Sequence, residues 1–84
     1  MPHVIVKLWP RKSEEQKQRL TDTTLHGVMK DLGYAQDAVS VAFEEVDPGE
    51  WDACVYRPDI IAKWPSLTKL PGYGDRPVEP RNEQ

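Results

Sequence analysis

The residue with the most distinctive chemistry in this chain is the proline at position 2. Removal of the initiator Met1, which a small second residue such as proline favours, leaves Pro2 with an amino-terminal secondary amine. Such an amine has a pKa of about 8 or higher, and an apolar pocket or nearby cations lower it. Its fixed φ also holds the nitrogen still. Pro2 is therefore a candidate general base for proton transfer near neutral pH, although a proline at this position is common and needs supporting context.

Two adjacent cations, Arg11 and Lys12, follow Pro2 by nine and ten residues. Residues 1–19 hold five cations and two anions, whereas residues 20–84 hold six cations and twelve anions. A local cationic spot on an acidic chain suits a small anion better than a polyanion, so we expect no nucleic-acid partner. The alternative is that Arg11 and Lys12 form an ordinary solvated turn.

The other reactive side chains give little support for catalysis. Cys54 is the sole cysteine of the chain, so there is no internal disulfide, and we expect it to be a small buried hydrophobe on a helix. His3 and His26 lie far apart in sequence, and we expect each at the surface or in packing rather than in a metal site. No phosphate-binding or cofactor motif is present. No apolar run is long enough to span a membrane and no signal peptide is apparent, so we expect a cytoplasmic protein.

The first half of the chain predicts a strand, a helix and a second strand. Residues 3–9 place Val4, Val6 and Leu8 on one face of a strand, three of the seven residues are β-branched, and Pro10 ends the run. Ser13 and Gln16 form a capping box that opens a helix over 13–32, and Gly33 suits its carboxyl end. Residues 38–46 alternate again. The fold class is therefore α+β, a β-α-β unit whose two strands are parallel and whose crossover is right-handed.

The second half of the chain contains shorter elements. Asp47 and Pro48 are typical of a helix start, and we expect a short helix to about Tyr56 that Pro58 stops. Asp59 then caps a further turn. We expect one domain over residues 1–73 and a disordered tail over 74–84.

The length of the chain, 84 residues, predicts self-association. A two-stranded sheet with one helix is not stable alone, and chains of this size often need a disulfide, a metal or a partner chain. The first two are not expected here. The sequence therefore predicts a homo-oligomer that completes the half-sheet.

The order of these features resembles the tautomerase superfamily, in particular the 4-oxalocrotonate tautomerase type. The resemblance is carried by Pro2 at the start of a strand, the cation before a capped helix, and the second strand. Trp51 and the 69–73 ending resemble the longer bacterial subgroup with a carboxyl-terminal extension. The segments concerned are residues 2–7, 12–17, 40–46 and 69–73.

The resemblance implies a β-α-β protein that works as an isomerase without cofactor or metal. Pro2 is then the general base and acid on an enol of a 2-oxo acid. Lys12 matches the family's carboxylate-binding arginine, with Arg11 beside it; Ser40 stands where the family has a second arginine, and Trp51 matches an aromatic beside the substrate. Family members pair their sheets, so a homodimer is favoured and a trimer of dimers is the alternative.

Two departures from the family pattern bear on the substrate. Ser40 removes one cationic clamp, and Lys12 replaces a bidentate guanidinium with a point charge. We therefore favour a monocarboxylate such as an aryl enolpyruvate over a dicarboxylate. The alternatives are a decarboxylase or hydrolytic dehalogenase, which would need a carboxylate such as Glu44 or Glu45, and a non-catalytic assembly module if Met1 is retained.

Overall fold

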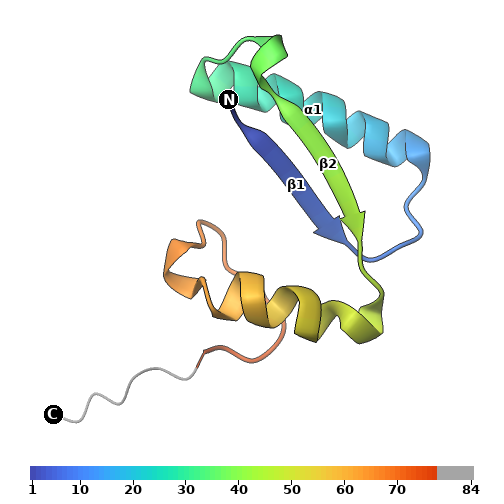
Figure 1. The fold of residues 1–84 in the computed structure, drawn as a ribbon, viewed down its shortest axis with the longest axis vertical. Coiled ribbons are helices and arrows are strands. Elements are labelled where there is room, and N and C mark those ends of the chain that lie inside the picture. The colour runs from blue at the N-terminus through green and yellow to red at the C-terminus, as the bar shows by residue number, and fades with distance from the viewer. Residues whose placement is uncertain (78–84) are drawn as a thin grey trace, which may run out of the picture. The chain divides into compact units, whose positions relative to one another are not determined.

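The computed structural model describes residues 1–77 and divides the chain into two compact units, Met1–Pro48 and a second that begins at Gly49 (Figure 1). From residue 78 on, the predicted tail lies outside the described residues. No helix in the described part of the chain is long and apolar enough to cross a membrane.

The first unit is built on two parallel strands, as the sequence predicts. Strand β1 spans His3–Leu8 and β2 spans Ser40–Glu45, with His3 opposite Ser40 and Leu8 opposite Glu45. The predicted β2 began two residues too early, because Ala38 closes a short 3₁₀ helix, η1 (Gln36–Ala38). The predicted β-α-β half-sheet is confirmed.

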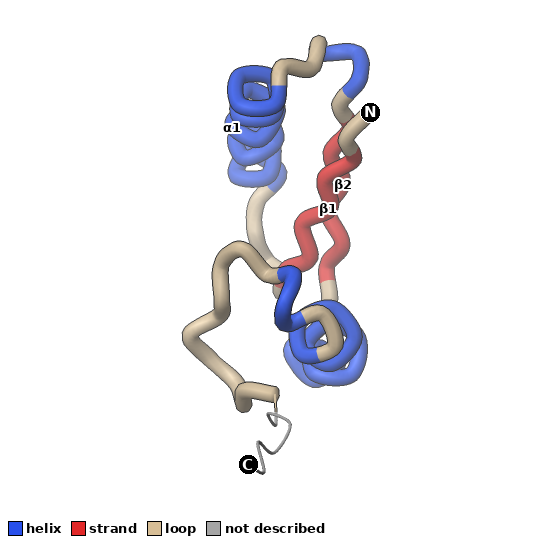
Figure 2. Tube along the Cα trace, turned by 90° about the vertical axis from the view of Figure 1, so that its left-hand side faces the viewer, coloured by secondary structure: helices blue, strands red, loops and turns tan. Residues whose placement is uncertain are grey.

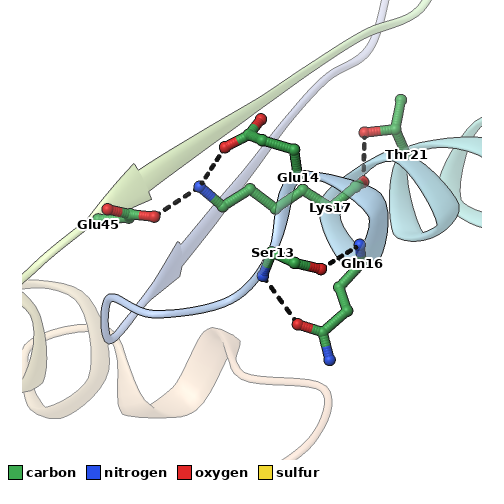
Figure 3. Close-up of polar contacts among 6 residues, drawn as sticks. All are labelled: Ser13, Glu14, Gln16, Lys17, Thr21 and Glu45. Carbon is green, nitrogen blue, oxygen red and sulfur yellow. Dashed lines mark hydrogen bonds and ion pairs between the residues drawn. The ribbon is translucent and has the colours of Figure 1, made fainter.

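Helix α1 (Glu14–Leu32) joins the two strands, and both of its ends have the predicted caps. The Ser13 hydroxyl accepts from the Gln16 N–H at 3.0 Å, and the Gln16 side chain accepts from the Ser13 N–H at 2.9 Å (Figure 3). Gly33 adopts a left-handed φ of 76° and donates its N–H to the Met29 carbonyl. These bonds satisfy backbone groups that a helix end otherwise leaves open.

The two faces of the sheet differ in what covers them within the first unit. Figure 2 shows α1 on one side of the strand pair, and alternation turns the half-buried Val4, Val6 and Phe43 toward this side. The opposite side carries His3 and Ile5, and Ile5 is 46% exposed. The apolar stripe predicted on α1 is only partly covered: Leu25 and Val28 are half-buried, whereas three members are exposed, Leu20, Met29 and Leu32.

Gly27 gives a direct test of helix packing in α1. A Cβ built on Gly27 meets no atom within 4 Å, so Gly27→Ala should raise the free energy of unfolding by about 0.5–1 kcal/mol through helix propensity alone. Gly33→Ala is the matched control and should lower it by about 1 kcal/mol, because φ is 76° there. Urea unfolding measures the free energy of unfolding of both variants. Changes of the same sign would contradict the placement of Gly27 inside α1 and Gly33 at its left-handed end.

The second unit corrects two predictions about Pro58 and Asp59. After η2 (Pro48–Glu50), a π-helix, η3, runs over Asp52–Ile61 with Pro58 inside it, and the 3₁₀ helix η4 spans Trp64–Ser66. Pro58 therefore does not stop the helix, and Asp59 lies within η3 rather than capping a separate turn. In an α-helix, a proline clashes with the carbonyl four residues back. The hydrogen bonds of η3 instead span five residues, as from the Ala62 N–H to the Arg57 carbonyl at 3.0 Å, and this wider spacing is why the helix continues through Pro58.

The interior of the second unit is formed by Val55 and Tyr56, which are 5% and 6% exposed. The Tyr56 hydroxyl donates to the carbonyls of Tyr73 and Asp75, at 3.1 and 2.9 Å. Cys54 is exposed, so its predicted burial is wrong. The π-helical register turns Val55 and Tyr56 inward and leaves Cys54 near the Glu50 carboxylate, with Sγ 4.0 Å from Oε1.

Candidate functional site

Pro2 lies directly before β1, and the start of β2 holds its backbone. The Ser40 N–H donates to the Pro2 carbonyl at 3.2 Å, which extends the parallel ladder by one residue. The ring is half-buried. The position of the Pro2 carbonyl is thus fixed by the sheet.

Ser40 also binds the residue that follows Pro2. Its Oγ lies 2.6 Å from Nδ1 of His3, across the register that pairs these two residues. Both side chains stand on the sheet face opposite α1. Sequence reasoning missed this role for His3, although the predicted parallel strands place positions 3 and 40 close together. Ser40 therefore presents a hydroxyl already bonded to an imidazole where the resemblance places a second guanidinium.

Arg11 and Lys12 lie beyond the opposite end of β1 and line different cavities. Arg11 lines a cavity of about 430 Å³ formed by residues that follow the two strands. Lys12 lines a cavity of about 220 Å³ between α1 and the sheet. The remaining lining residues of this second cavity are Leu8, Gln16, Lys17, Leu20 and Phe43. Arg11 and Lys12 are adjacent in sequence, but neither can take the place of the other, because each lines a different cavity.

The length of β1 separates Pro2 from these cations within one chain. The strand runs from the amino terminus to its arrowhead without a bend back (Figure 1). The seven residue-to-residue steps from Pro2 to Trp9 span about 23 Å at about 3.3 Å each. A small substrate that contacts Pro2 of one chain therefore cannot reach Arg11 or Lys12 of the same chain.

Trp51 belongs to the second unit. Its indole N–H donates to the Tyr73 hydroxyl at 3.1 Å, and the Tyr73 ring lies 5.5 Å from that of Tyr56, centroid to centroid. Trp51 is half-buried. Its indole is thus fixed by the segment near residue 73 that resembles the longer subgroup.

Residues 1–77 contain no cluster of three or more His, Cys, Asp or Glu side chains suited to a metal ion.

Lys17, near the start of α1, forms ion pairs that link this helix to the end of β2. It lies close to the turn that contains Arg11 and Lys12. Its Nζ lies 2.5 Å from Glu45 Oε2 and 3.5 Å from Glu14 Oε2 (Figure 3). The hydrogen bond to Glu45, followed by the charges of both carboxylates, outweighs desolvation and raises the pKa of Lys17 above its ordinary value. The ion pairs therefore favour the charged lysine in the folded chain.

This raised pKa predicts how stability depends on pH. Because the folded pKa lies above the unfolded value of about 10.4, the contribution of Lys17 is complete below pH 10 or so and is lost as pH rises through the raised pKa. The stability difference between wild type and Lys17→Met should therefore be constant from pH 7 to about 9 and shrink in strong alkali. Denaturant unfolding across this range measures it, with Lys63→Met as the control. A stability difference between wild type and Lys17→Met that grows in alkali would contradict the pairing of Lys17 with Glu45 and Glu14.

The comparisons with known proteins agree with the β-α-β fold. Residues 2–53 match the family model described as Tautomerase enzyme. A probable tautomerase from Xylella fastidiosa (strain 9a5c) is 45% identical over 74 residues, which cover 88% of this chain and 90% of that protein. Tautomerase PptA from Pectobacterium carotovorum subsp. carotovorum (strain PC1) is 40% identical over 74 residues, covering 87% and 97% respectively.

A solved structure shows the same likeness. YwhB, a homologue of 4-oxalocrotonate tautomerase, matches with a TM-score of 0.53 at 28% identity, over 55% of this chain and 75% of its own. The parallel strands and the connecting helix, together with these matches, define a β-α-β isomerase of the tautomerase type. The chain belongs to the tautomerase family, and the resemblance found in the sequence is confirmed.

Proposed function

We propose that this protein is a cofactor-independent keto–enol tautomerase that uses the amino-terminal amine of Pro2, freed by removal of Met1. The observation that carries the proposal is the placement of Pro2: the match to the tautomerase family begins at this residue, and the Ser40 N–H holds its carbonyl. A fixed ring nitrogen at the edge of a sheet suits proton transfer, which requires a base within hydrogen-bond reach of the proton.

The proposed reaction moves one proton and keeps all atoms. The neutral Pro2 nitrogen accepts the hydroxyl proton of the enol, and the O–H electron pair forms the new carbonyl. The C=C electron pair accepts a proton from the resulting ammonium at the carbon atom. The amine returns to its neutral form, so the cycle needs no other reactant.

We further propose that the site is shared between chains of a homo-oligomer, with a dimer favoured. The span of about 23 Å along β1 separates Pro2 from Arg11 and Lys12. A second copy running the other way brings its own cations to the Pro2 end. Ile5 on the sheet face opposite α1 and Trp9 just beyond the end of β1 are 46% and 56% exposed, which supports contact with another chain.

The proposed substrate is the enol of a 2-oxo monocarboxylic acid, such as an aryl enolpyruvate. One carboxylate needs one cationic partner, and Arg11 or Lys12 supplies it. A second carboxylate would meet the Ser40 hydroxyl, which is already bonded to His3, in place of a guanidinium. A hydroxyl neutralises no charge, so a dicarboxylate gains less here.

Ultraviolet absorbance tests this proposal, because the conjugated enol absorbs at a longer wavelength than its keto form. Phenylenolpyruvate and the dicarboxylate 2-hydroxymuconate are compared at equal concentration with the oligomeric protein. We expect turnover of both with a higher kcat/KM for phenylenolpyruvate, by about tenfold, as for the loss of one charge-assisted bond. A higher kcat/KM for 2-hydroxymuconate would overturn the substrate class, and no acceleration of either decay would overturn the activity.

A further inference from the structure

The carboxyl ends of the two parallel strands frame the cavity that contains Arg11. Trp9, Pro10 and Arg11 follow β1, Asp47 and Pro48 follow β2, and these five residues line about 430 Å³ within the first unit. The Val46 N–H donates to the Leu8 carbonyl at 2.8 Å and holds the two segments together. Each wall contains a proline with a fixed φ, so the cavity is preformed. Open parallel sheets bind ligands at this end of their strands.

The backbone at Arg11 is strained. It is the one non-glycine residue in the described part of the chain with a positive φ, 85°. A side chain with a Cβ is disfavoured in this conformation, and such outliers concentrate at ligand-binding sites. Glycine would fit this turn without strain. An arginine here therefore points to a use for its side chain.

Arg11 and Trp9 present free recognition groups to this cavity. Arg11 is exposed and, among the described residues, has no hydrogen-bond or ion-pair partner. Trp9 is 56% exposed despite its large apolar ring. A guanidinium binds a carboxylate through two parallel bonds, and an indole stacks on a planar conjugated group. Asp47 contributes one negative charge to the same cavity.

We propose that Arg11 and Trp9 bind the carboxylate and the planar conjugated part of the substrate, and that Asp47 excludes a second carboxylate from this cavity. The inference rests on the proposed function and makes it more specific: Arg11, rather than Lys12, provides the carboxylate contact. Lys12 lines the other cavity, where the ion-paired Lys17 is its neighbour. The ligand class is thus a planar, conjugated monocarboxylate.

Binding of an unreactive probe tests the inference apart from turnover. Cinnamate, a planar aryl monocarboxylate, is titrated calorimetrically into the oligomeric protein. We expect Arg11→Gln to weaken binding about tenfold or more, Arg11→Lys less, and Trp9→Leu about threefold to tenfold. Arg19→Gln, the same change on exposed α1 surface, is the matched control. Weakening by Lys12→Gln that equals or exceeds that of Arg11→Gln would overturn the assignment, as would unchanged binding in Arg11→Gln.

Two further measurements test Asp47 and the strain. Muconate, a conjugated dicarboxylate, should bind more weakly than cinnamate. Asp47→Asn should reduce the ratio of the muconate and cinnamate dissociation constants about threefold or more. An unchanged ratio would overturn the role of Asp47. Arg11→Gly should raise the midpoint of thermal unfolding by a few degrees while weakening cinnamate binding. A lowered midpoint would overturn the strain argument.

The inference and the proposed function fail in different ways. Arg11-dependent cinnamate binding without turnover of any enol would remove the tautomerase proposal and leave the carboxylate site. The opposite result is Pro2-dependent turnover without cinnamate binding at millimolar concentration. It would refute the carboxylate site at Arg11 and leave the tautomerase proposal standing.

Discussion

Pro2→Ala is expected to lower kcat/KM for phenylenolpyruvate by about 10²- to 10⁴-fold, the contribution that a positioned general base makes to proton transfer. Alanine also permits removal of Met1 and keeps an amino-terminal amine. That amine is primary and lacks the ring that fixes the nitrogen, so residual activity remains. The backbone carbonyl at position 2 is kept in the variant and still accepts the bond that the Ser40 N–H makes in the wild type. The loss should therefore occur without unfolding.

A proline outside the site gives the matched control. Pro65→Ala makes the same change in η4, at an exposed position in the second unit. Kinetics of both variants, with circular dichroism to compare their folds, separate chemistry from stability. Turnover by Pro2→Ala at the wild-type rate would remove the proline from the mechanism.

Gly74→Ala is expected to destabilise the second unit by about 2–3 kcal/mol. A Cβ at Gly74 would lie 2.6 Å from Cζ of Tyr56, and φ is 76° there. The Tyr56 hydroxyl binds the carbonyls on both sides of Gly74, those of Tyr73 and Asp75. The buried ring therefore cannot move away without losing these bonds. Overpacking of this kind costs about 1–3 kcal/mol, and the positive φ adds to it.

Gly72 offers a control two residues away. A Cβ there meets no atom within 4 Å and no positive φ is present, so Gly72→Ala should change stability by less than about 0.5 kcal/mol. Thermal unfolding of the two variants gives the comparison, since 1 kcal/mol corresponds to about 4–8 °C for a domain of this size. Equal midpoints for the two variants would contradict the contact between Gly74 and Tyr56.

The β-α-β part of the fold was predictable because its signals are local. Ser13 and Gln16 cap α1 as their spacing indicates, and Gly33 takes the left-handed conformation that ends it. Parallel strands follow from a helix between two alternating runs. The π-helix was not predictable in this way. Whether Pro58 stops a helix depends on the hydrogen-bond spacing around it, which residue types do not specify, and the exposure of Cys54 follows from the same spacing.

The candidate site was predictable in residue type but not in arrangement. Pro2, Arg11 and Lys12 suit an acid–base reaction on a small anion, yet sequence alone does not reveal that Arg11 and Lys12 line different cavities. The chain also takes a positive φ at Arg11, a conformation that a non-glycine residue rarely adopts and that residue types do not predict. Trp9 ends the first predicted strand and Asp47 directly follows the second, yet neither was named as a candidate site residue from the sequence. The rule that parallel sheets bind ligands at their carboxyl ends would have identified both.

The central claim is that the free amine of Pro2 performs the proton transfer. The most direct measurement is the intact mass of the purified protein combined with phenylenolpyruvate turnover on the same sample. We predict that active protein has lost Met1, and that a preparation in which Met1 is retained is inactive, because an amide nitrogen cannot accept the proton. Full turnover by protein that retains Met1 would contradict the claim.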